Sequence, residues 1–451
     1  MADHEVTLEE IVSLAKRRGF IFPGSEIYGG LAGTWDYGPH GVTLKNNIKR
    51  MWWKRFVDDR EDIYGVDAAI LMNEKVWEAS GHVAGFSDPL VEDLKTKKRY
   101  RADHLLEEAN INPAGMDLEE MTKAIKENNI LSPDKNELSE VRQFNMMFKT
   151  EVGALGGQYS YLRPETAQGI FVNFKNVVDS MQPKMPFGIA QIGKAFRNEI
   201  TPREFIFRVR EMEQMEIEYF VHPDEWEKSF NHFLNQLREW MEDIGLTKGR
   251  VHEVDIAEED RAHYSSKTID IEFDFPFGQR ELYGLAYRTD YDLKKHAEHS
   301  GAKLQYRDDV KGEVFTPHVI EPSLGLDRTF LAILTSAYTK DTVGGEERAY
   351  LKLKKDLAPV RVMVSPLLKN KPELQEKARE VFSMLKKEFG NVMYDDNGNI
   401  GKRYRRQDEI GTPYCVTIDF ETLEGQGVTV RDRDTAEQER VDIDDLISKL
   451  S

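Results

Sequence analysis

The chain has 451 residues, 40% of them hydrophobic, and carries 62 Lys and Arg against 80 Asp and Glu, a formal net charge of −18. This balance is typical of a globular protein of two or three domains, and the acidic field argues against indiscriminate binding of nucleic acid. One cysteine, Cys415, excludes an internal disulfide, while the lack of a roughly 20-residue apolar stretch or an apolar signal region favours a cytoplasmic protein without a membrane segment.

Two helices are predicted in the N-terminal part, on either side of a glycine-rich turn. Leu8, Ile11 and Leu14 share one helical face, with Thr7 as the N-cap. After the turn, residues 42–57 carry a second apolar stripe. It is formed by Leu44, Ile48, Met51, Trp52 and Phe56. This stripe packs either against the protein's own core, which is the commoner case, or against a second subunit.

The middle of the chain predicts an insertion followed by a sheet. Residues 80–151 are irregular, with polar turns between short helices. Strand-like segments rich in aromatic residues then recur. They are residues 158–162, 187–199, 205–220, 268–275, 281–287 and 312–323. Only one long helix, over residues 223–245, interrupts them, and strands with few crossover helices indicate a largely antiparallel α+β sheet.

The C-terminal part changes character near Ala358. Strands and helices alternate there, which is typical of a separate α/β module. The predicted strands are residues 360–365, 391–396, 413–419 and 427–434, and the predicted helices are residues 371–390, 402–411 and 441–450.

Residues 196–220 are unusually charged for a strand-forming segment. Pro202 interrupts it, so we expect two antiparallel strands joined by a loop. Arg197 and Glu199 share a face of the first strand. On the second, Arg208, Arg210, Met212, Gln214 and Glu216 face one way, and Phe207, Val209, Met215, Ile217 and Tyr219 face the other. A polar face exposed to water is the ordinary outcome for such a strand. Here, however, the arginines come first along the chain and the glutamates after them. This order would suit an elongated ligand with a phosphate at one end and an ammonium at the other.

Three segments, in order, resemble the motifs of the class II aminoacyl-tRNA synthetases. Residues 38–56 resemble motif 1, residues 196–216 motif 2, and residues 321–338, a strand turning into a helix, motif 3. Within the class, YLRPETAQGIF, FRNEITPREFIFRVRE and ELYGLAYRTDYDL are similar to glycyl-tRNA synthetase of the α2 homodimeric type.

The resemblance implies both fold and reaction. It implies a catalytic domain over residues 1–357, with an insertion at about 81–150 and an antiparallel sheet of six or seven strands, and an anticodon-binding domain over 358–451. It further implies a homodimer that activates glycine with ATP and Mg²⁺, releases pyrophosphate, and transfers glycine to tRNA(Gly). The alternatives are a class II synthetase for another small amino acid, or a related RNA-binding protein without catalysis.

For ATP, the resemblance implies catalytic roles for Arg197, Glu199 and Arg328. The full ATP set is Arg197, Asn198, Glu199, Phe207, Arg208, Val209, Arg210, Glu211, Met212, Glu281, Leu282, Gly325, Leu326, Asp327 and Arg328, with Glu281 as the Mg²⁺ ligand. Arg328 has a physical reason as well, because a cation at a helix start opposes the helix dipole unless it binds an anion. It could instead reach water or pair with Asp327 or Glu321. The family usually has an aromatic residue where this chain has Met212.

For glycine, the implied set is Arg99, Glu165, Met212, Glu213, Gln214, Met215, Glu216, Glu321, Pro322, Ser323, Leu324 and Gly325. Glycine cannot be selected by filling an apolar pocket, since a methyl group is worth only ~1–3 kcal/mol and would favour larger residues. Carboxylates that hold the ammonium and crowd the α-hydrogens would exclude a side chain. For tRNA, the implied residues are Lys402, Arg403, Arg405 and Arg406 in the anticodon-binding domain.

Overall fold

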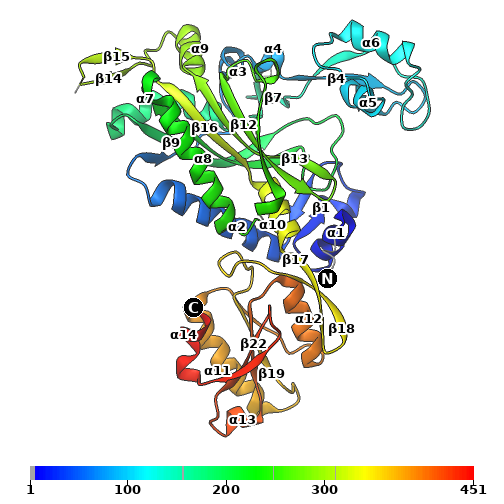
Figure 1. Cartoon of the computed structure of the whole chain (residues 1–451), viewed down its shortest axis with the longest axis vertical. Coiled ribbons are helices and arrows are strands. Elements are labelled where there is room, and N and C mark those ends of the chain that lie inside the picture. The colour runs from blue at the N-terminus through cyan, green and yellow to red at the C-terminus, as the bar shows by residue number, and fades with distance from the viewer. Residues whose placement is uncertain (1–5, 155–156, 247, 310) are drawn as a thin grey trace.

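The computed structural model describes residues 6–154, 157–246, 248–309 and 311–451 (Figure 1). A seven-stranded sheet lies at the centre of the larger body, in the strand order β11-β12-β13-β16-β10-β9-β3. In that order the strands are Val251–Asp255, Lys267–Phe275, Gly278–Thr289, His318–Gly325, Glu211–Val221, Phe187–Phe196 and Ile63–Gly65. All neighbouring pairs are antiparallel except β3 and β9. The predicted antiparallel α+β sheet is therefore confirmed.

Helices cover this sheet unequally on its two faces (Figure 1). The helices against the main apolar core are α2 (Pro39–Trp53), α8 (Trp226–Asp243) and α10 (Leu326–Ala337), and those against the other face are α7 (Ala167–Met181) and α9 (Tyr291–Ser300). Met215, Ile217 and Tyr219 of β10 enter the main core, whereas Phe220 lies under α7. Since α7 and α9 cover only part of their face, the rest of it is free to form the floor of a cavity.

The two N-terminal helices form as predicted. α1 (Leu8–Arg17) begins with a capping box between Thr7 and Glu10. β1 (Ile21–Pro23) pairs with β2 (Trp35–Tyr37), and α2 follows. Its apolar stripe is buried within the same chain, with Leu44, Ile48, Trp52 and Phe56 inaccessible to solvent. The buried side of this helix therefore packs on the protein's own core.

The charged segment after β9 differs from its prediction. β9 ends at Phe196 and β10 begins only at Glu211, so the expected strand over residues 205–210 is wrong. Glu204 and Phe205 have positive φ angles of 54° and 57°, and the chain turns there. The side chains of Phe205, Ile206 and Phe207 are all buried in the core. A strand alternates its faces and cannot bury three consecutive side chains on one side, so the turn prevails.

The insertion is more regular than the sequence indicated. β4 (Ser87–Glu92) lies between β5 (Arg99–Arg101) and β6 (Arg142–Asn145). With α5 (Ala102–Glu108) and α6 (Leu118–Glu127) these strands enclose a small apolar core of their own, apart from the main sheet (Figure 1). Its strands are short and partly exposed, so no periodicity of 2 marks them in the sequence.

Short elements complete the larger body. They are α3 (Glu74–Ala79), α4 (His82–Gly85), β7 (Lys149–Val152), β8 (Gln158–Tyr161), β14 (Tyr306–Asp308), β15 (Glu313–Phe315), β17 (Tyr338–Val343) and β18 (Glu346–Leu351). Among the described residues, no helix has the length and apolar character needed to cross a membrane.

The C-terminal module holds a five-stranded mixed sheet with the order β20-β19-β21-β22-β23. Its strands are, in that order, Val392–Tyr394, Val362–Pro366, Tyr414–Ile418, Val428–Asp432 and Gln438–Val441, and its helices are α11 (Pro372–Phe389), α12 (Ile400–Ile410), α13 (Phe420–Leu423) and α14 (Leu446–Leu450). The sequence missed β23, whose side chains are mostly exposed, and made the last helix too long. The main core reaches Leu357 and the module's core begins at Val362. The boundary near Ala358 stays a prediction.

Candidate active site

A cavity of about 340 Å³ opens on the uncovered face of the sheet. Its floor comes from the even-numbered residues Met212, Gln214 and Glu216 of β10, while the odd-numbered Met215, Ile217 and Tyr219 enter the core, so the predicted alternation of faces holds for these residues. The predicted ligand residues that line it are Glu165, Arg197, Glu199, Phe207, Arg208, Val209, Met212, Glu213, Gln214, Glu216, Glu281, Leu282, Glu321, Ser323, Gly325, Asp327 and Arg328.

The remaining predicted residues lie elsewhere. Met215, Leu324 and Leu326 are buried in the apolar core, and Pro322 is buried too. The side chains of Arg210 and Glu211 point to other partners, namely the backbone oxygens of Ala32 and Glu199 for Arg210 and Lys194 for Glu211. Asn198 contributes a backbone N–H to the oxygen of Met146. Arg99 lies in the insertion with its side chain 55% exposed and does not line the cavity.

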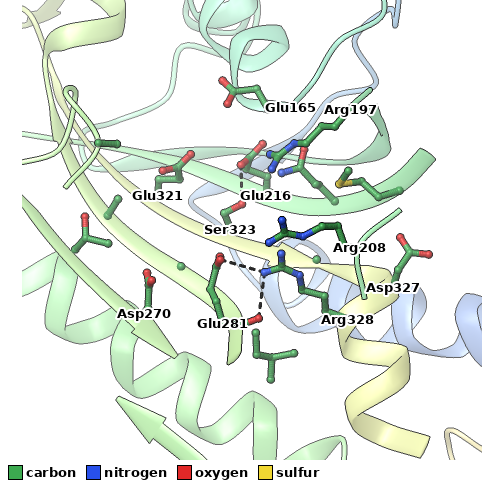
Figure 2. A pocket seen from close by; sticks show the side chains of 18 of the residues that line it. Glu165, Arg197, Arg208, Glu216, Asp270, Glu281, Glu321, Ser323, Asp327 and Arg328 are labelled. Atoms are coloured by element: carbon green, nitrogen blue, oxygen red, sulfur yellow. Dashed lines mark hydrogen bonds and ion pairs between the residues drawn. The ribbon is translucent and has the colours of Figure 1, made fainter. Parts of the chain in front are cut away.

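Carboxylates gather at one end of the cavity (Figure 2). Glu216 accepts hydrogen bonds from the hydroxyl of Thr166 and from the hydroxyl of Ser323 at 2.8 Å. Glu321 accepts from the Arg288 guanidinium at 2.7 Å. Burial raises the pKa of Glu321 to about 8, assisted by Glu216 and Glu165 and opposed by Arg288. This end is therefore a crowded anionic site that a cation would stabilise.

Glu165 is held differently from its neighbours. His82 Nε2 lies 3.3 Å from one of its oxygens, and Gln168 donates to the other at 3.0 Å. Burial by itself would raise the pKa of Glu165, but His82, Arg288 and Gln168 outweigh it and lower the pKa. Glu165 is thus the carboxylate of this group that stays ionised most readily.

Arginines gather at the opposite end, where Arg208 and Arg328 point into the same space (Figure 2). Arg328 pairs with Glu281, 3.1 Å from its carboxylate and 3.0 Å from its backbone oxygen, and lies over the Phe207 ring. Neither Asp327 nor Glu321, the partners considered from the sequence, takes that place. One nitrogen of Arg208, Nη1, is buried and has no hydrogen-bond partner within the described parts of the chain. An anion would satisfy it.

Asp327 has a structural role beside the cavity. It accepts hydrogen bonds from the Tyr37 hydroxyl and from the backbone N–H of Glu213, and Lys45 lies 3.4 Å away. These contacts tie α10 to β2, α2 and β10. Arg328 therefore projects from a helix start whose position is fixed by its neighbour in sequence.

Sequence reasoning missed several residues around the cavity. Arg288 is 1% exposed and donates to Asp292 through two nitrogens as well as to Glu321. His82, which contacts Glu165, lies at the edge of the insertion. The arginine of the insertion that interacts electrostatically with Glu199 is Arg101 and not Arg99. Arg288 lies on β13 and Asp292 on α9, so no spacing within one element signalled their contact in the sequence.

The residues predicted to bind tRNA all lie on α12, but their side chains differ in solvent exposure. Lys402 is exposed, and Arg405 is 39% exposed and pairs with Glu346. Arg406 pairs with Asp395 at 2.7 Å. Arg403 is 1% exposed and donates to Ser365 and to three backbone oxygens, so its side chain is occupied in holding the module together.

Family models match both parts of the chain. The model "tRNA synthetase class II core domain (G, H, P, S and T)" matches residues 148–337, and "Anticodon binding domain" matches residues 361–451. The prolyl-tRNA synthetase of Giardia lamblia, solved in complex with prolyl-adenylate, has the same fold with a TM-score of 0.67 at 15% identity, over 98% of this chain and 75% of that one. The fold and the site define a class II aminoacyl-tRNA synthetase core with an anticodon-binding domain.

Full-length relatives narrow the class to a family. The glycine–tRNA ligase of Caldanaerobacter subterraneus subsp. tengcongensis is 52% identical, over 98% of this chain and 97% of its own length. The glycine–tRNA ligase of Clostridium tetani is also 52% identical, over 99% and 98% of the two chains. The chain belongs to the glycine–tRNA ligase family.

Proposed function

We propose that this protein joins glycine to tRNA(Gly) in two steps within the cavity described above. The glycine carboxylate attacks the α-phosphate of ATP, which releases pyrophosphate and leaves glycyl-adenylate, and a ribose hydroxyl of the tRNA then displaces AMP. Within this one cavity, Arg208 and Arg328 lie apart from Glu165, Glu216 and Glu321, and this separation of charge supports the proposal most directly (Figure 2). With ATP and labelled glycine, the protein should charge a tRNA(Gly) transcript. Charging of the transcript without glycine, or with serine in place of glycine, would contradict the proposal.

At the cationic end, Arg208 and Arg328 act on phosphate. Arg197, whose Nε donates to the backbone oxygen of Pro164, lies nearer the carboxylates and acts on phosphate from there (Figure 2). Both steps place negative charge on phosphate oxygens, and guanidinium groups already fixed in position stabilise that charge without reorganising. The partnerless nitrogen of Arg208 and the accessible pair of Arg328 with Glu281 support this assignment. Glu199, which is buried and also lines this region, is proposed to accept from the adenine amino group.

Mg²⁺ fits the same end through Glu281 and Asp270. Both side chains line the cavity, and burial together with the charges of Glu281 and Glu272 raises the pKa of Asp270 to about 7. The pKa of Glu281 is itself lowered, chiefly by Arg328, so its carboxylate stays charged, and two neighbouring carboxyl groups are a suitable oxygen donor set for a hard divalent cation. A bound Mg²⁺ would neutralise phosphate charge there. Glu281 would hold it, with Asp270 as the added ligand that the sequence did not indicate.

At the anionic end, Glu165, Glu216 and Glu321 hold the glycine ammonium, and Ser323 fixes Glu216. A methyl group on the substrate would meet these carboxylates and desolvate their charge, so larger amino acids are excluded by repulsion and not by a filled pocket. The hydrogen bonds that restrain Glu216 and Glu321 support a site too rigid to retreat from a side chain.

For tRNA, we propose contact through the exposed basic face of α12. Lys402 and Arg405 carry it, because Arg403 is buried. Arg406 pairs with Asp395, whose side chain is only 11% exposed, whereas Glu346, the partner of Arg405, is exposed. The double variant Lys402→Glu/Arg405→Glu should raise the KM for tRNA about tenfold, since each lost phosphate contact removes counterion release. Glycine-dependent pyrophosphate exchange should not change. Equal KM values for tRNA in the variant and the native protein would rule this surface out.

We also propose a homodimer, in the cytoplasm. Ile27, Tyr28 and Leu31 are 88%, 87% and 60% exposed on the segment between β1 and β2, and such an apolar patch supports a protein partner. Sedimentation equilibrium at micromolar concentration should give twice the mass of the chain. A mass of one chain would contradict the dimer, and recovery with a membrane or organelle fraction would contradict the location.

A further inference from the structure

One carboxyl group beneath the cavity has no counterpart among the predicted residues. Glu218 is the next even-numbered residue of β10 after Glu216, and it lies between the cavity floor and the part of the face that α7 covers. Its side chain is inaccessible to solvent. Neither of its carboxyl oxygens has a hydrogen-bond partner within the described parts of the chain.

The surroundings of Glu218 contrast with those of the neighbouring carboxylates. Glu216 is held by two hydroxyls, Glu321 by Arg288, and Glu165 by His82 and Gln168. Oxygen atoms of Glu216, Glu218 and Glu321 all lie within 4.8 Å of one another. Each of the other carboxylates therefore has a donor, and Glu218 sits among acceptors.

Three buried carboxylates at this separation cannot all carry charge without a strong cation between them. Arg288 is the cation that acts on Glu218, but it already binds Asp292 with two nitrogens and Glu321 with a third. Burial, with Glu321 as the next cause, raises the pKa of Glu218 well above its ordinary range; Glu216 and Asp292 add to this rise and Arg288 opposes it. A protonated carboxyl is a donor, which is what its neighbours can accept.

We propose that Glu218 is a positioning residue of the glycine site, a neutral carboxylic acid that donates a hydrogen bond to the adjoining glutamates and holds them toward the substrate ammonium. This inference rests on the proposed function. It concerns a residue below the cavity floor that does not touch the substrate. If Glu218 carried charge instead, the three oxygens would suit a divalent cation better than an ammonium.

Two variants of Glu218 distinguish a neutral hydrogen-bond donor at this position from a charged carboxylate. Glu218→Gln keeps a donor of the same shape, and we expect its KM for glycine and its kcat in pyrophosphate exchange to stay within about threefold of the native values at pH 7. Glu218→Leu removes the donor, and we expect the KM for glycine to rise at least tenfold with kcat and the KM for ATP unchanged. A rise in the KM for glycine without a change in kcat, which glutamine at this position prevents, is not expected of a residue that only fills space.

Several results would overturn the inference. A glutamine variant as impaired as the leucine variant would mean that the charged form is needed, and a leucine variant with native KM would mean that no donor is needed. Competitive inhibition of glycine by Ca²⁺ at pH 7, absent in Glu218→Gln, would assign the three oxygens to a divalent cation. Absence of glycine-driven pyrophosphate exchange in the native protein would count against the proposed function instead.

The pH profile gives a check that does not need the leucine variant to fold. Because its pKa is raised, Glu218 keeps its proton at neutral pH and loses it only as the pH rises toward that pKa. The ratio of kcat/KM for glycine between the native protein and Glu218→Gln should therefore be flat from pH 6 to pH 7, below the pKa of about 8 of Glu321. A ratio that changes with pH in this range would show that Glu218 titrates there and would overturn the proposal.

Discussion

Arg328→Ala should lower glycine-driven ATP–pyrophosphate exchange by about 10²- to 10³-fold, the range seen when one fixed donor to a developing oxyanion is removed. Arg328 lies in the first turn of α10, where its charge opposes the helix dipole, and its fixed protein partner is the half-exposed carboxylate of Glu281. Binding of an ATP phosphate best explains why an arginine occupies that position. The loss should fall on the chemistry, since a partly exposed pair contributes little to stability.

The control is Arg280→Ala on the neighbouring strand β13. Arg280 is exposed, does not line the cavity, and donates to the backbone oxygen of Gln279. Its variant should keep native exchange and a native thermal transition. Near-normal exchange in Arg328→Ala would remove Arg328 from the ATP site, and a shift of its thermal transition much beyond that of the control would indicate damage to the fold.

Arg288→Met should have the largest effect on stability, about 3–5 kcal/mol in the free energy of unfolding. The guanidinium is 1% exposed and serves Asp292 and Glu321, so its removal leaves two buried carboxyl groups without their cation. The denaturant midpoint of the catalytic domain measures this loss. The KM for glycine should rise as well, because Glu321 loses the donor that orients it.

The matched control is Arg238→Met on α8. Arg238 makes a comparable two-nitrogen contact, with Glu253 at 2.6 and 2.7 Å, but its side chain is 47% exposed. Because exposed ion pairs contribute about 0–1 kcal/mol, its variant should be nearly as stable as the native protein. Equal losses in the two variants would mean that burial of the Arg288 network does not matter.

The sequence was sufficient to predict an element wherever the conformation of that element depends on its own residues. The resemblance of residues 321–338 to motif 3 predicted the turn from β16 into α10, and the alternation of side chains predicted the two faces of β10; both are found. The class II fold and the glycine–tRNA ligase family were also predicted, because the motifs that identify them are contiguous.

The failures share a physical cause, which is that burial depends on the tertiary fold. Residues 205–210 have strand-forming side chains, yet packing of Phe205, Ile206 and Phe207 into one core bends them into a turn. Arg403 belongs to a basic run that is typical of a solvated face, but it is inaccessible. Glu218 looks like any glutamate of a polar strand face until β16 and α7 enclose it.

Pyrophosphate exchange across a panel of amino acids tests the central claim most directly, that the anionic end of the cavity selects glycine by excluding side chains. We expect exchange with glycine, and kcat/KM for alanine, serine, threonine and proline lower by at least 10³-fold, since each side chain would clash with restrained carboxylates and remove their water. Exchange with alanine or serine comparable to that with glycine would contradict selection by exclusion.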